Sequence, residues 1–86
     1  MRNEFVLDCV VQGVSIREFT ADNGSKRRVF FCRVGFMGGD GVFALNEDMG
    51  LKVEQGKLYR FRGYIAKGKN GLGFRVTSIE ELESAA

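Results

Sequence analysis

The 86-residue chain contains no histidine and no tryptophan, and only two cysteines, Cys9 and Cys32. Without histidine the commonest general base and a frequent zinc ligand are missing, and the two cysteines lack C-x-x-C spacing. The acidic pairs at residues 47–48 and 80–81 lie in turn or tail segments, which favours solvated charge over paired catalytic carboxylates. We therefore expect a protein that is not an enzyme, with no metal and no cofactor. Both thiols are expected to be reduced and buried as small core side chains, with a disulfide or a reactive thiol as the alternative.

Long apolar runs are also missing. Nothing approaches the roughly 18 consecutive apolar residues of a membrane span, and the N-terminal MRNEFVLD lacks the apolar core of a signal peptide. We expect a cytoplasmic protein without membrane contact. A length of 86 residues with 44% hydrophobic content suits one small domain. It is expected to span residues 1–80, with a short acidic tail at 81–86.

Charge is unevenly distributed along the sequence, although the formal net charge is only +2. Eleven of the thirteen basic residues lie between Lys26 and Arg75, against four acidic ones, a local excess of seven positive charges. Every charged residue after Arg75 is acidic. A basic body of this kind indicates a surface that binds a polyanion, and the alternative is that the cations only keep a β-protein in solution.

Alternation of apolar and polar residues predicts five strands, with glycine-rich turns between them and neither proline nor an internal repeat. The strands are expected at residues 4–19, 26–37, 42–46, 58–66 and 72–79. A helical turn around residues 48–53 is kept short by Gly50 and Gly56. Five short strands with so little helix predict a small closed or nearly closed barrel, because a flat sheet would leave one apolar face in water.

The first strand changes its inward face at Gly13. Odd-numbered apolar residues from Phe5 to Val11 share one face, whereas Val14 and Ile16 share the other. A β-bulge at Gly13 would allow both sets to be buried, and glycine supplies the positive φ or the close approach that a bulge tends to need. We therefore expect Gly13→Val to destabilise the fold strongly.

The order of these elements is that of an OB fold: a long coiled strand, a hairpin, a linker with room for a short helix, and a closing hairpin. Residues 9–36, CVVQGVSIREFTADNGSKRRVFFCRVGF, resemble the first two strands of the bacterial and phage single-stranded DNA-binding proteins. Residues 51–82, LKVEQGKLYRFRGYIAKGKNGLGFRVTSIEEL, resemble the closing hairpin of that family. The resemblance implies an all-β, five-stranded OB-fold barrel with a short or absent helix between strands three and four.

The sequence departs from this family in several places. Its linker between strands three and four is shorter, it lacks the tryptophans that many members use for stacking, and no long glycine-rich tail follows the barrel. The acidic end EELESAA has no terminal aromatic residue. In length and in its minimal barrel the chain also looks like the small single-stranded DNA-binding proteins of filamentous phages.

Strand parity predicts which side chains point outward. If Phe30 and Cys32 fill the core, Phe31 points out between Arg27 and Arg33. Aromatic rings among arginines fit single-stranded nucleic acid, because bases stack on the rings while the cations follow the phosphates. Loop 67–71, which contains two lysines, is expected to be the arm between strands four and five that OB folds commonly close over a bound strand. The candidate nucleic-acid-binding residues are Arg27, Phe31, Arg33, Phe43, Arg60, Arg62, Tyr64, Lys67, Lys69 and Arg75.

Other interpretations exist for individual members of this set. Phe31 could belong to a second core or to a dimer interface, Phe43 could equally be core or binding face, and Tyr64 could cover bare backbone. The arginines of the fourth strand could simply be solvated on an edge.

Two classes of function follow from these interpretations. The first is a protein that coats single-stranded nucleic acid in replication, recombination, or phage or plasmid propagation. DNA is favoured over RNA as its ligand, although no residue of the sequence decides between them. The alternative is an OB-type protein-interaction or assembly subunit that binds no nucleic acid. In either class the chain could form a homodimer or a higher homo-oligomer.

Overall fold

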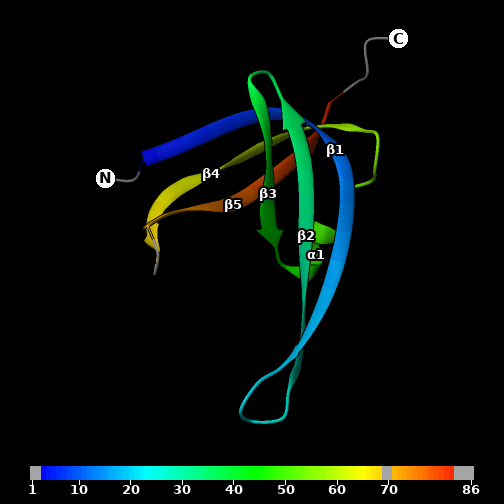
Figure 1. Ribbon diagram of the computed structural model, residues 1–86, viewed down its shortest axis with the longest axis vertical. Coiled ribbons are helices and arrows are strands. Elements are labelled where there is room, and N and C mark those ends of the chain that lie inside the picture. The colour runs from blue at the N-terminus through cyan, green and yellow to red at the C-terminus, as the bar shows by residue number, and fades with distance from the viewer. Residues whose placement is uncertain (1–2, 69–70, 83–86) are drawn as a thin grey trace.

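The computed structural model describes residues 3–68 and 71–82, and its backbone is a strongly curled antiparallel sheet with one short helix (Figure 1). The elements along the chain are β1 (Asn3–Thr20), β2 (Lys26–Phe36), β3 (Gly39–Leu45), α1 (Glu47–Gly50), β4 (Leu58–Gly68) and β5 (Gly71–Glu81). All five predicted strands are confirmed, although β3 starts three residues earlier than expected and β5 includes Glu81. No helix in the described ranges is long and apolar enough to cross a membrane.

The sheet has the order β3-β2-β1-β4-β5, so β3 and β5 are its edges. These two edges come close together as the sheet curls. In the described part of the chain they are not paired in the sheet, so the barrel is nearly closed and has an open seam between β3 and β5. The long β1 holds it together, because its first half pairs with β4 and its second half with β2.

The core lies inside this curl and combines inward residues from four strands with one residue of the linker. Its buried members are Cys9, Val11, Phe30, Cys32, Val34, Leu45, Val53, Tyr59 and Phe61. The Tyr59 hydroxyl accepts a hydrogen bond from the backbone N–H of Glu54 at 2.7 Å, so the buried hydroxyl has a partner. Both cysteines are free and buried, as expected, and burial raises the pKa of each thiol to about 11.

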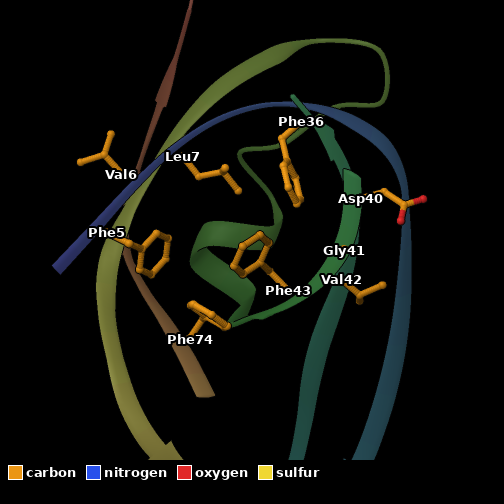
Figure 2. Close-up of a pocket in the computed structure, with 9 residues that line it drawn as sticks. All are labelled: Phe5, Val6, Leu7, Phe36, Asp40, Gly41, Val42, Phe43 and Phe74. Carbon is orange, nitrogen blue, oxygen red and sulfur yellow. The ribbon is translucent and has the colours of Figure 1, made fainter. Parts of the chain in front are cut away.

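The two ends of the barrel differ. At one end α1, capped by the Asn46 side chain, which accepts from the N–H of Met49 at 2.9 Å, packs so tightly that a Cβ on Gly50 would lie 2.1 Å from Phe30 Cγ. The other end is an apolar cavity of about 390 Å³ whose walls include four phenylalanines. Figure 2 shows Phe5 and Phe43 facing each other across it, with α1 behind.

The bulge predicted in β1 is confirmed, because the register with β2 shifts between Val11 and Gly13. The expectation that the bulge needs a positive φ or a close approach at Gly13 is wrong. Gly13 does not have a positive φ, and a Cβ added to it would meet no atom within 4 Å. A side chain at residue 13 is therefore compatible with the bulge.

The expected burial of Val14 and Ile16 is also wrong, although their parity is right. They pair with Cys32 and Phe30 on the inward side of the sheet, yet they are 37% and 55% exposed. Their partners Cys32 and Phe30 are nevertheless buried, because α1 packs mainly against β2 and β3 and leaves this part of β1 uncovered. From the pair Arg17 and Val29 onward, β1 and β2 continue past the core as a two-stranded arm, residues 17–29, which Figure 1 shows extending beyond α1 to the turn at 21–25.

Candidate nucleic-acid interface

Most of the predicted binding residues divide over two outward surfaces of the curled sheet. Directly paired residues of antiparallel strands point to the same side, so the registers show which side chains share a surface. On the first surface, Phe31 lies opposite Ser15 and Arg33 opposite Gly13. On the second, formed by β1, β4 and β5, lie the arginines of β4.

The first surface carries three arginines and two phenylalanines, and we call it the cationic face. The register from the tip of the arm inward places Phe19 beside Arg27, Arg17 beside Val29, and then Phe31 and Arg33. The cationic face is thus defined by Arg17, Phe19, Arg27, Phe31 and Arg33.

Phe31 is the centre of this face. Its cross-strand neighbours are Ser15 on β1 and Ala44 on β3, both too small to cover the ring. The ring is partly buried, and the guanidinium carbon of Arg17 lies 5.6 Å from its centroid, within cation–π range. The parity prediction for Phe31 is therefore confirmed, and its ring belongs to the outer surface rather than to the core.

The three arginines of the cationic face are exposed, and none forms a salt bridge to a carboxylate within residues 3–68 and 71–82. The nearest acid along the arm, Glu18, points to the other side. There it lies 3.6 Å from Lys26 Nζ and 4.0 Å from Arg28 Nε. Asp40 on β3 shares this side of the sheet, opposite Gly35, but forms no ion pair with these arginines in the described residues. The cationic face therefore keeps an excess of positive charge that is available to an anion.

Two members of this face were missed from the sequence. Arg17 and Phe19, the latter 48% exposed, were not among the predicted binding residues. The signal was present, because the parity switch at Gly13 puts the odd-numbered residues of the second half of β1 on the same side as Phe31. The same alternation, continued past Gly13, predicts that Arg17 and Phe19 point outward.

The second surface has compensated charge, and we call it the balanced face. Three of its charged residues are acidic and three are basic: Glu4, Asp8, Glu80, Arg60, Arg62 and Arg75. Arg60 donates two hydrogen bonds to the Asp8 carboxylate, from Nε to Oδ1 at 2.7 Å and from Nη2 to Oδ2 at 3.0 Å. The hydrogen bond from Arg60 holds the pKa of Asp8 below its ordinary value.

The remaining predicted residues are Phe43, Tyr64, Lys67 and Lys69. Phe43 points into the barrel, where its ring centroid is 5.4 Å from that of Phe61 and 6.1 Å from that of Phe5. Of the two alternatives for Phe43, a core position or a position on the binding face, the structure therefore supports the core position. Tyr64 is partly buried on the balanced face, where it lies opposite Glu4 and Arg75, and Lys67 is exposed near the end of β4. Lys69 lies outside the described residues.

A comparison with solved structures agrees with this architecture. The solution NMR structure of the second OB-fold domain of replication protein A from Methanococcus maripaludis is similar to this chain with a TM-score of 0.59 and 22% sequence identity, covering 100% of this chain and 88% of that one. No family model matches the sequence, and no curated protein is significantly similar to it. The likeness, the strand order and the bulged first strand show that the chain is a five-stranded OB fold with a one-turn helix between β3 and β4.

Proposed function

We propose that this OB-fold chain binds single-stranded nucleic acid, DNA in the first place, along the cationic face, and catalyses no reaction. The observation that carries the proposal is the placement of two accessible phenylalanines and three arginines on one continuous surface, where the arginines have no ion-pair partner among the residues that the structure describes. Arginines neutralise phosphates, and each base stacked on an aromatic ring contributes about 1 to 3 kcal/mol. The resemblance to bacterial and phage single-stranded DNA-binding proteins supports the same ligand, and the OB fold is one on which oligonucleotides are bound.

The spacing of the two rings suits an extended strand. Phe19 lies opposite Arg27, and Phe31 lies four residues further along β2. Four residues of a strand span about 13 Å, so the rings would contact different bases of one strand, while Arg17 and Arg27 lie between and beside them. A duplex would present only its phosphates to this face, because its bases are paired and stacked. We therefore propose a role in coating single-stranded DNA during replication, recombination, or phage or plasmid propagation.

Fluorescence anisotropy with labelled oligo-dT, oligo-rU and duplex DNA over a range of salt concentrations tests the proposal. Three phosphates neutralised by the arginines predict a slope of log K against log salt of about −2, at about −0.7 for each contact on a single strand. Absence of oligo-dT binding at low salt would refute the proposal. Equal affinity for duplex DNA would refute the stacking part of it.

A protein-interaction role is the second candidate, and the open end of the barrel favours it. Val42 and Phe74, which line the 390 Å³ cavity, are 56% and 51% exposed, and large exposed apolar groups mark many protein contacts. Sedimentation of the protein alone, with and without oligo-dT, separates the two candidates. A stable oligomer whose sedimentation does not change with oligo-dT would favour the assembly role.

A further inference from the structure

Gly13 lies at a position where the backbone does not require glycine. Its φ is outside the positive range, and a Cβ there would have no neighbour within 4 Å. The glycine at the second bulge is different, because a Cβ on Gly63 would lie 1.9 Å from the carbonyl oxygen of Arg75. A β-branched residue in a strand would even be favoured over glycine by up to about 1 kcal/mol. The reason for a glycine at 13 is therefore not found in the stability of the fold.

Gly13 lies in the wall of a hollow in the cationic face. The hollow has a volume of about 340 Å³ and is lined by Gly13, Val14, Ser15, Phe31, Arg33 and Val42. Arg33 pairs with Gly13 across the ladder, and Phe31 pairs with Ser15, one step along. The hollow thus has an aromatic wall, a cationic rim and a floor formed by bare backbone.

We propose that this hollow receives one unstacked nucleobase of the bound strand, with the base against Phe31 and its phosphate beside Arg33. The inference rests on the proposed function and assigns it a subsite. Gly13 and Arg17 lie on opposite sides of Ser15 along β1, so the cation–π contact of Arg17 supports Phe31 from the side away from the hollow. A base entering beside Gly13 would complete a row in which Arg17, Phe31, the base and Arg33 follow one another.

The chemistry of the hollow predicts weak discrimination among the bases. Its walls offer the phenyl ring and the apolar surface of Val42, while hydrogen-bonding groups are limited to the Ser15 hydroxyl, the Arg33 guanidinium and the backbone. Every base has a face that can stack on a ring, so stacking alone is tolerant of sequence. A branched side chain at residue 13 would occupy part of the hollow and leave less room for the base.

The test uses Gly13→Val, which fills the hollow from its floor, and Ser15→Leu, which fills it without altering the bulge. Ser78→Val is the matched control, since Ser78 is an exposed strand residue opposite Arg62 on the balanced face. Melting temperature, affinity for oligo-dT at low salt and the salt slope are measured for each. We expect both filling variants to lose about tenfold in affinity, with the salt slope and melting temperature little changed. The control is expected to bind as the unaltered chain does.

Binding to a strand with abasic sites completes the experiment. The unaltered chain should prefer oligo-dT to the abasic strand by a larger factor than Gly13→Val does, because only the unaltered chain can insert a base. A folded Gly13→Val that binds oligo-dT as tightly as the unaltered chain overturns the subsite while leaving the proposed function intact. If Gly13→Val does not fold, the same criterion applies to Ser15→Leu. Failure of the unaltered chain to bind oligo-dT overturns the proposed function itself.

Discussion

The cationic face and the balanced face are built from the same kinds of residue, yet they differ in what lies opposite each arginine. On the balanced face, Arg60 lies opposite Asp8 on β1 and Glu80 on β5, and the aspartate takes up its hydrogen bonds. On the cationic face, Arg33 lies opposite Gly13 and Val42. Alternation of arginine with an aromatic residue along one strand is therefore not enough to make an anion site. The neighbouring strands decide whether the charge is free.

The largest expected effect concerns the strand contact beneath the balanced face. In Gly63→Ala the new Cβ would lie 1.9 Å from the Arg75 carbonyl oxygen and 2.9 Å from Phe5 Cε1, so β5 would have to move away. We expect a loss of about 3 kcal/mol or more in the free energy of unfolding, at the upper end of overpacking. Urea unfolding measures it, with Gly13→Ala, which meets no atom, as the control. Equal stability of the two variants would contradict the difference between the bulges.

Next in size is the contrast between an outward and an inward phenylalanine. Phe43→Ala removes a ring that packs on Phe5 and Phe61, and we expect roughly 2 to 4 kcal/mol of lost stability for this partly buried side chain. Phe31→Ala should instead cost about 1 to 3 kcal/mol of affinity for oligo-dT. Thermal unfolding measures the loss of stability of each variant, and titration with oligo-dT measures its loss of affinity. Severe unfolding of Phe31→Ala would place Phe31 in the core after all.

A pair of double variants compares the charges of the two faces directly. Both remove two arginines and so change the net charge equally. Arg27→Ala with Arg33→Ala should make the salt slope shallower by about 1.4, at about 0.7 for each lost phosphate contact. Arg62→Ala with Arg75→Ala should leave the slope nearly unchanged. Titration of oligo-dT at four or more salt concentrations measures both slopes, and equal losses would mean that the strand also contacts the balanced face.

The smallest effect is expected at the ion pair of the balanced face. Since Arg60 lowers the pKa of Asp8 in the folded state from its ordinary value of 3.8, the ionised carboxylate stabilises the fold above that value. The stabilisation is lost as the pH falls through the lower folded-state pKa. Asp8→Asn should therefore melt slightly below the unaltered chain at neutral pH, and the gap should close in strong acid. Because the ion pair is exposed, the difference in melting temperature between the two proteins is expected to be small. A difference that widens in acid would show that this ion pair is not its source.

Much of the fold could be predicted because it depends on local periodicity. Five strands follow from alternation with a period of two, and the bulge follows from the change of parity at Gly13. The exposure of Ile16 could not be predicted, because parity says which side a residue faces but not whether anything covers that side. Here α1 packs mainly against β2 and β3, so Phe30 is covered while its partner Ile16 on β1 is not.

The candidate site was harder to predict, because it depends on pairing between distant segments. The hydrogen bonds from Arg60 to Asp8 join residues that are 52 positions apart, and nothing near Arg60 in the sequence indicates its partner. Phe43 lies in a run of apolar residues without alternation, so its direction had no local signal. Phe31, in contrast, alternates regularly with the core residues Phe30 and Cys32, and its outward direction followed from that pattern.

The double role of β1 has a consequence for how the chain reaches this fold. Its second half pairs with β2 through a short turn, whereas its first half pairs with β4, so that Asn3 lies opposite Ile65. On a ribosome the arm can form early, while Phe5 and Leu7 remain without β4 until most of the chain has been synthesised. Non-local pairing of this kind slows folding to milliseconds or longer in all-β domains. Until β4 has paired with it, the apolar first half of β1 is open to association with other nascent chains.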